Sequence, residues 1–122
     1  MTHDHPILVV EDDEDIRESL VELLRDRGYH AIGARDGRDA LATLSHAETL
    51  PCLIVLDLMM PVMDGKAFRD EQLRDPVLSK IPVLVISAYH DAETRAHALN
   101  TPMAMKKPLD LDRFLDLVQR NC

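Results

Sequence analysis

The side chains of this sequence that are best suited to chemistry are carboxylates, a hydroxyl and a lysine, and each follows a short apolar run. They are Glu11, Asp12, Asp57, Ser87 and Lys107. Carboxylates a few ångströms apart repel one another, and Mg²⁺ relieves that repulsion because it binds carboxylate, water and phosphate oxygens. A carboxylate can also attack phosphorus and form an acyl phosphate. These residue types therefore predict a magnesium-dependent phosphoryl-transfer site, provided that the fold brings them together.

Each of these residues has an expected role. Asp57 is the candidate nucleophile. Asp12 and Asp57 suit direct ligation of Mg²⁺, and Glu11 suits a second position, direct or through water. Phosphoryl transfer depends mostly on positioning and on neutralising charge, to which the Lys107 ammonium and the Ser87 hydroxyl would contribute. Taken alone, Ser87 would be an ordinary strand-end hydroxyl and Lys107 a solvated charge; their joint placement favours the functional interpretation.

The elements that must position these residues alternate between strand and helix. Continuous β-branched apolar runs predict buried strands, and apolar residues three or four positions apart predict helices. The predicted strands are residues 7–10, 29–34, 53–56, 82–86 and 103–106, and the predicted helices are residues 13–27, 65–73 and 91–99, with two more starting at 36 and 110. This alternation predicts an α/β fold, a doubly wound five-stranded parallel sheet with helices on both faces. Ligands of such sheets bind beyond the carboxyl ends of the strands, where all the candidate residues lie.

Particular residues mark the expected helix ends. Asp13 is assigned to the start of the first helix, where its charge complements the positive helix end. Gly28 is expected to end that helix, and Asp110 to cap the last one. The residues of the last helix that are expected to face inward are Leu111, Phe114, Leu115 and Val118.

Length, charge and cysteine content limit the class of protein. The chain of 122 residues is expected to be a single domain over residues 1–122, with its core at about 7–118. Its formal net charge of -8 argues against binding nucleic acid or an anionic membrane, since both need clustered cations. No signal peptide and no apolar run of membrane-spanning length is visible. Cys52 and Cys122 make no disulfide framework, so two thiols and a cytoplasmic location are expected.

Four stretches of the sequence resemble the receiver domain of two-component response regulators. They are Val9-Val10-Glu11-Asp12-Asp13, Leu56-Asp57-Leu58-Met59-Met60-Pro61-Val62-Met63-Asp64-Gly65, Val85-Ile86-Ser87-Ala88 and Lys107-Pro108. The second stretch is highly specific, and the resemblance extends from residue 7 to about 118. It implies a flavodoxin-like sheet with strand order 2-1-3-4-5.

The resemblance implies a role for each matching residue. Asp57 matches the phosphoacceptor, which is also a metal ligand. Asp12 and Glu11 match the acidic pair that holds Mg²⁺, and Met59 would offer its backbone carbonyl to the metal. Met59 and Ala88 are the expected cofactor-binding positions. In addition, Ser87 matches the switch hydroxyl, Lys107 matches the pocket lysine, and the Lys107–Pro108 bond would be cis.

The resemblance also implies partners. The phosphoryl donor would be a histidine kinase or a histidine phosphotransfer protein, and the domain would catalyse only its own phosphorylation and dephosphorylation. Without an output domain of its own, it would act by altered binding to a downstream protein that the sequence does not name. A monomer and a phosphorylation-dependent homodimer both remain open.

Two departures from the receiver pattern leave an alternative. Ala104 stands where receivers usually have an aromatic residue, and Asn100-Thr101-Pro102 replaces the usual Gly-Ala turn. They favour a second interpretation, a receiver-like scaffold that binds its partner without phosphorylation. Tyr89 is a candidate substitute for the aromatic residue. Met59 and Tyr89 would also border the path of the attacking water, so slow self-hydrolysis is expected.

Two other classes on the same kind of sheet fit poorly. An Asp-nucleophile phosphatase needs an acid/base carboxylate two residues after the nucleophile, and Met59 stands there. A flavin-binding fold needs a hydroxyl-rich phosphate loop after the first strand, and the acidic cluster stands there instead.

Overall fold

The computed structural model describes residues 5–88 and 90–122. Within these residues five strands alternate with five α-helices and one short 3₁₀-helix at Leu78–Lys80. The strands are β1 Ile7–Val10, β2 Ala31–Ala34, β3 Leu53–Asp57, β4 Val83–Ser87 and β5 Met103–Lys106. The helices are α1 Glu14–Asp26, α2 Gly37–Ser45, α3 Gly65–Arg74, α4 Ala92–Ala98 and α5 Leu111–Asn121.

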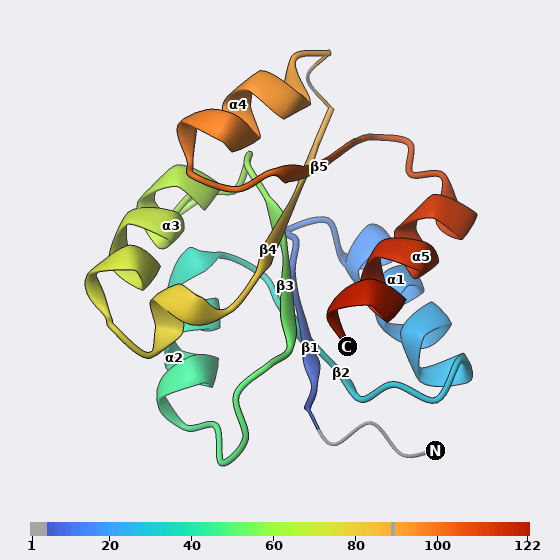
Figure 1. Cartoon of the computed structure of the whole chain (residues 1–122). Helices are drawn as coiled ribbons and strands as arrows, with labels where there is room; N and C mark the ends of the chain where they lie inside the picture. Colours follow the sequence, from blue (N-terminus) through green and yellow to red (C-terminus); the bar gives the residue numbers. More distant parts are fainter. Residues whose placement is uncertain (1–4, 89) are drawn as a thin grey trace.

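All strand pairs are parallel, and the strand order is β2-β1-β3-β4-β5. Helices α1 and α5 cover one face of the sheet, and α2, α3 and α4 cover the other (Figure 1). The order and the doubly wound α/β class predicted from the sequence are confirmed. Among the described residues, no helix has the length and apolar character needed to cross a membrane.

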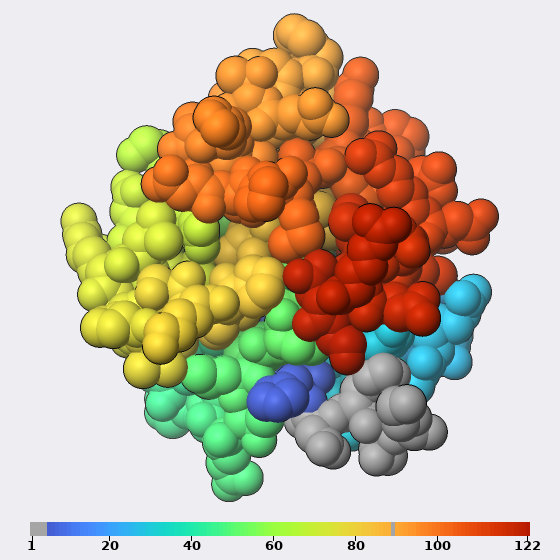
Figure 2. All heavy atoms as spheres, viewed as in Figure 1, coloured from blue at the N-terminus to red at the C-terminus, as the bar shows by residue number. Residues whose placement is uncertain are grey.

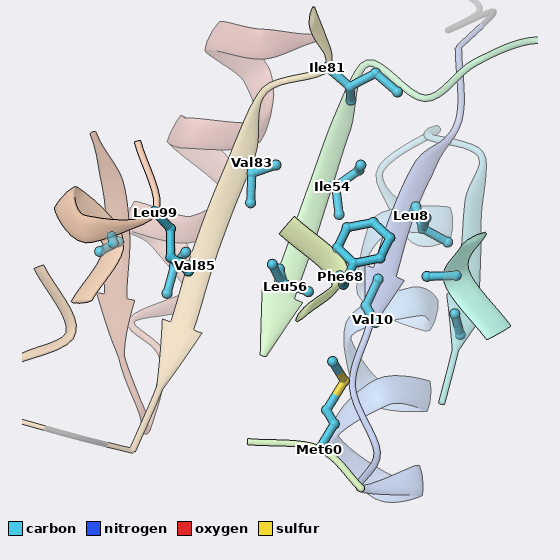
Figure 3. Packing of buried hydrophobic residues seen from close by; sticks show 14 of the residues in the cluster. Leu8, Val10, Ile54, Leu56, Met60, Phe68, Ile81, Val83, Val85 and Leu99 are labelled. Carbon is cyan, nitrogen blue, oxygen red and sulfur yellow. The ribbon is translucent and has the colours of Figure 1, made fainter. Parts of the chain in front are cut away.

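The alternation of side chains along the strands divides the core into two layers. Leu8 and Val10 point to one face, and Ile7 and Val9 point to the other. Figure 3 shows the first layer, in which the ring of Phe68 from α3 lies among strand residues. Phe114 of α5 has the matching place in the second layer. Because β1, β3 and β4 are covered on both faces, their sequences are continuous apolar runs.

Aspartates begin four of the helices. In each case a carboxylate oxygen accepts a hydrogen bond from the backbone N–H three residues later, as a good N-cap does. These N-caps are Asp13, Asp36, Asp64 and Asp110. The prediction that Asp13 starts α1 is confirmed, as is the end of α1 at Gly28, whose φ of 89° suits glycine.

Two boundary predictions need correction. Strand β2 starts at Ala31 and not at Tyr29, because the Tyr29 N–H still donates to the Leu24 carbonyl at the end of α1. The prediction that Leu111 faces inward is wrong: it is 49% exposed, because it lies in the first turn of α5 beside an open surface hollow. Phe114 and Val118 are fully buried as predicted.

The prediction of two free thiols is also wrong. Cys52, just before β3, and Cys122, just after α5, form a disulfide with their Cα atoms 5.5 Å apart. They are 70 positions apart in the sequence, and only the packing of α5 on the sheet makes them neighbours. The sequence pattern carried no signal of that contact.

Candidate functional site at the carboxyl edge of the sheet

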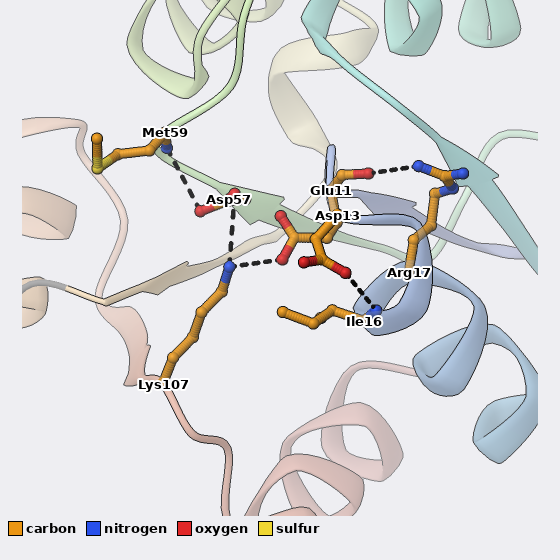
Figure 4. A network of polar contacts seen from close by, with 7 residues as sticks. All are labelled: Glu11, Asp13, Ile16, Arg17, Asp57, Met59 and Lys107. Atoms are coloured by element: carbon orange, nitrogen blue, oxygen red, sulfur yellow. Dashed lines mark hydrogen bonds and ion pairs between the residues drawn. The ribbon is translucent and has the colours of Figure 1, made fainter.

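Parallel pairing brings the candidate residues to one edge of the sheet. Val10 of β1 lies opposite Leu56 of β3, so the residues that follow them, Glu11 and Asp57, lie at the same level. Ser87 is paired with Lys106, and Lys107 follows directly. Figure 4 shows the side chains of Glu11, Asp57 and Lys107 pointing toward one another. The predicted convergence is therefore present.

Three carboxylates form the centre of the site. Glu11, Asp12 and Asp57 each offer an oxygen within 4.8 Å of the others. Glu11 and Asp57 are buried, whereas Asp12 is exposed. Glu11 Oε2 is buried without a hydrogen-bond partner among the described residues. An orphaned carboxylate oxygen is costly to bury, and a hard divalent cation would satisfy it, so the residues present fit Mg²⁺.

Lys107 connects two of these carboxylates. Its Nζ lies 2.5 Å from Glu11 Oε1 and 3.5 Å from Asp57 Oδ2. Burial alone would lower the pKa of Lys107, but the hydrogen bond to Glu11 and the charge of Asp57 outweigh it and raise that pKa. The lysine therefore stays a cation at the point where two buried carboxylates meet.

The electrostatics of Glu11 differ from those of an ordinary glutamate. Burial raises the pKa of Glu11 from 4.5 to about 8, and the neighbouring Asp57 acts in the same direction, while Lys107 opposes both. Burial is therefore the main reason that Glu11 holds its proton more tightly than an ordinary glutamate, and the negative charge of Asp57 adds to it. A cation close to both side chains would favour their charged forms.

One hydrogen bond orients the Asp57 carboxylate, and another holds the backbone of Glu11. The Met59 N–H donates to Asp57 Oδ1 at 3.3 Å, and the side chain of Met59 is 57% exposed. Arg17 Nη1 donates to the backbone carbonyl of Glu11 at 2.9 Å. Sequence reasoning missed Arg17, because a charged residue on a helix gives no signal that it reaches back to the preceding strand end.

The start of α3 lies unusually close to the candidate nucleophile. A Cβ added at Gly65 would lie 2.7 Å from the Asp57 carbonyl oxygen and 2.8 Å from Leu58 Cα. The Gly65 N–H also donates to the Leu58 carbonyl at 3.2 Å. Only glycine permits this approach. The sequence contained the signal, since Asp64-Gly65 belongs to the specific stretch, but the reason becomes clear only from the structure.

The remaining predicted residues lie around this centre. Ser87 is buried at the end of β4, and its carbonyl accepts from the Lys107 N–H at 2.8 Å. Ala88 follows it and is exposed. The Lys107–Pro108 bond is cis, as the resemblance implied. The structure leaves the expected roles of Ala88, and of the Met59 carbonyl as a ligand, as predictions.

The region that departs from the receiver pattern has contacts of its own. Ala104 is 8% exposed within β5. Asn100 has a φ of 59°, the left-handed conformation that glycine often supplies, and the Thr101 hydroxyl donates to the Val83 carbonyl. Arg69 of α3, a buried cation, donates to the Leu99 and Asn100 carbonyls at 2.9 and 3.0 Å. Tyr89, the suggested aromatic substitute, lies outside the described residues.

A doubly wound parallel sheet with an acidic cluster, an aspartate and a lysine at its carboxyl edge is the architecture that the resemblance to receiver domains implied. Residues 7–119 match the sequence model of the response regulator receiver domain. The chain therefore belongs to the response regulator receiver domain family, as the resemblance predicted.

Individual relatives agree with this assignment. The chain is 40% identical over 93% of its length to the transcriptional regulatory protein ZraR of Escherichia coli (strain K12), and 32% identical over 98% of its length to the regulatory protein AtoC of the same organism. It spans 26% of the length of each of these two proteins. In three dimensions it is similar to the chemotaxis protein CheY4 of Vibrio cholerae, with a TM-score of 0.84, 28% identity and coverage of 97% and 98% of the two chains.

Proposed function

We propose that this receiver domain is a phosphorylation switch that accepts a phosphoryl group on Asp57 from a phosphohistidine of a histidine kinase or histidine phosphotransfer protein. The observation that carries the proposal is the buried Asp57 carboxylate beside the Lys107 ammonium, with the unpartnered Glu11 oxygen in the same cluster. A protein that only needed a stable core would gain nothing from burying these charges together.

The chain's own residues account for the chemistry. An Asp57 oxygen forms the new O–P bond while the P–N bond to the donor imidazole breaks, and the imidazole nitrogen keeps the electron pair. The Met59 N–H orients the carboxylate, and Lys107 Nζ neutralises negative charge on the phosphoryl group. The Ser87 hydroxyl at the neighbouring strand end would donate a hydrogen bond to a phosphoryl oxygen.

Mg²⁺ would be held by the side chains of Glu11, Asp12 and Asp57. The Met59 carbonyl would be a further ligand, and Ala88 would lie at the rim of this site. When bound, Mg²⁺ would neutralise charge on the transferring phosphoryl oxygens. Water then returns Asp57 to its resting carboxylate. The exposed Met59 side chain is suited to hinder that water, so slow self-hydrolysis is part of the proposal.

The proposed output is a change in binding to a downstream protein. A cytoplasmic location, and a state that is either monomeric or dimeric on phosphorylation, belong to the same proposal and rest on the family. No catalytic activity beyond self-phosphorylation and self-dephosphorylation is proposed.

A phosphorylation-independent scaffold is the second candidate, and one observation favours it. Ala104 provides no ring to report the state of the pocket, although it occupies a nearly buried position in β5. The intact charge cluster favours the switch, since a scaffold has no need of an unpartnered buried carboxylate oxygen.

Intact-mass analysis separates these two candidates. The protein is incubated with a small phosphodonor, with and without Mg²⁺, alongside Asp57→Asn. We expect one phosphoryl group on the wild type, only with Mg²⁺, and none on the variant. A folded wild type that binds Mg²⁺ but gains no phosphoryl group would support the scaffold.

A further inference from the structure

The Cys52–Cys122 disulfide joins two segments whose other ends meet in the candidate site. Cys52 directly precedes strand β3, which ends at Asp57, and the segment that follows Lys107 leads through α5 to Cys122. At one end Lys107 Nζ lies 3.5 Å from Asp57 Oδ2, and at the other the two sulfurs are bonded. The disulfide therefore lies at the amino edge of the sheet, opposite the carboxylate cluster, and the phosphoryl chemistry proposed above does not use it.

The two residues of the disulfide differ in exposure. Cys122 is exposed, directly after the last turn of α5, whereas Cys52 is half-buried at the start of β3. In the space-filling view, the last residues of α5, in dark red, lie at the surface (Figure 2). Cys122 is therefore the more accessible residue of the pair. Exposed disulfides are the ones most open to exchange.

The fold can accommodate both redox states. Cys52 Sγ lies 3.6 Å from the carbonyl oxygens of both His5 and Pro6, so a reduced Cys52 has hydrogen-bond acceptors already in place. The core of α5 is held independently by Phe114 and Val118, which are fully buried. Reduction would therefore remove the covalent link at the end of α5, leaving the Asn121 amide contact to Met103 Sδ at 3.4 Å as a remaining side-chain tie there, without removing the contacts that hold the rest of the helix.

We propose that Cys52–Cys122 is a reversible thiol–disulfide exchange site that takes dithiol reductants and fastens the end of α5 to the sheet. A thiolate of the dithiol attacks Cys122 Sγ, the S–S bond breaks, and Cys52 leaves as a thiolate that takes up a proton. The second thiol of the reductant then attacks the mixed disulfide and releases Cys122 as a thiol. The protein gains two electrons and two protons, and the dithiol becomes a disulfide. Exchange with a small-molecule disulfide reverses the change.

The test is reduction of the native protein, followed by thiol alkylation and intact mass. The folded chain is equilibrated with mixtures of reduced and oxidised dithiothreitol, without denaturant. We expect two alkyl groups to be added together in the reducing mixtures, and none where excess oxidised dithiothreitol has re-formed the disulfide before alkylation. Hydrogen exchange should rise roughly tenfold or more at residues 119–122 on reduction, with no change in β1 or β3.

A matched variant makes the result specific. Cys122→Ser removes the exposed partner, and its residues 119–122 should exchange at the fast rate under reducing and oxidising conditions alike. The proposal is overturned if the disulfide reacts only after denaturant unfolds the domain, if the native protein shows two thiols before any reductant is added, or if reduction leaves hydrogen exchange at the end of α5 unchanged. None of these results depends on phosphorylation of Asp57, so this proposal and the phosphorylation switch can fail separately.

Discussion

Replacing Gly65 with alanine should damage the phosphorylation site through a single methyl group. The added Cβ would lie 2.7 Å from the Asp57 carbonyl oxygen and 2.8 Å from Leu58 Cα. Both neighbours are backbone atoms that carry the nucleophile, so neither can move aside without shifting Asp57 or α3. Overpacking of this kind costs about 1–3 kcal/mol. That loss is a substantial share of a typical domain stability of roughly 5–15 kcal/mol.

Gly28→Ala is the matched control, because it makes the same substitution at a distance from the site. Gly28 has a φ of 89°, and a Cβ there would meet nothing within 4 Å. Its cost is conformational only, about 1–2 kcal/mol. The two variants should therefore be destabilised to a similar extent, while their effects on phosphorylation should differ.

Urea unfolding and a phosphorylation time course measured by intact mass test this pair. We expect both variants to lose stability and only Gly65→Ala to be phosphorylated more slowly, by about tenfold or more, because positioning supplies much of the rate. The reasoning is refuted if Gly65→Ala keeps wild-type stability and rate, or if Gly28→Ala slows phosphorylation to the same extent.

Further predictions concern charge, pH and the disulfide. Lys107→Met should slow phosphorylation by a small donor about 100-fold or more, because it removes a charge that neutralises the phosphoryl group. Mg²⁺ titration of the same variant should show unchanged or tighter metal binding. Equal phosphorylation rates for the variant and the wild type would contradict this prediction. Folding without Mg²⁺ raises the pKa of Glu11 from 4.5 to about 8. Between these two pH values the folded protein therefore keeps a proton on Glu11 that the unfolded chain has lost. Its free energy of unfolding should therefore fall as pH rises through that window, and Glu11→Gln should flatten the pH dependence measured by urea unfolding. A wild-type slope of the opposite sign would refute the assignment. Finally, because the disulfide spans 70 positions, chain entropy predicts a loss of about 4 kcal/mol in Cys122→Ser; thermal unfolding that does not differ from the wild type would contradict this estimate.

Local patterns were enough to predict most of the fold. The β-branched runs at β1, β3 and β4 identify buried strands, and capping aspartates such as Asp36 and Asp110 mark helix starts. Strand β2 was less well bounded, because Ala31–Ala34 holds only one β-branched residue and Tyr29, shortly before it, also favours a strand. Leu111 was misplaced because helical periodicity does not show that the first turn of a helix lies beside an open surface hollow.

The site was predictable where residue type and strand ends coincide. Asp57, Glu11 and Lys107 follow apolar runs, and parallel topology brings such ends together. Contacts between distant segments could not be predicted in this way. The Cys52–Cys122 bond and the binding of Arg69 to the carbonyls at the end of α4 both depend on how helices pack, and no local pattern encodes that packing.

The central claim is that Asp57 itself carries the phosphoryl group, and borohydride trapping tests it most directly. The phosphorylated protein is reduced with borohydride, which converts an aspartyl phosphate to homoserine, and is then digested and sequenced by mass spectrometry. The account predicts homoserine at position 57 alone, and only in samples treated with phosphodonor and Mg²⁺. Homoserine at another aspartate such as Asp12, or a phosphoryl group that resists borohydride on a serine or histidine, would contradict it.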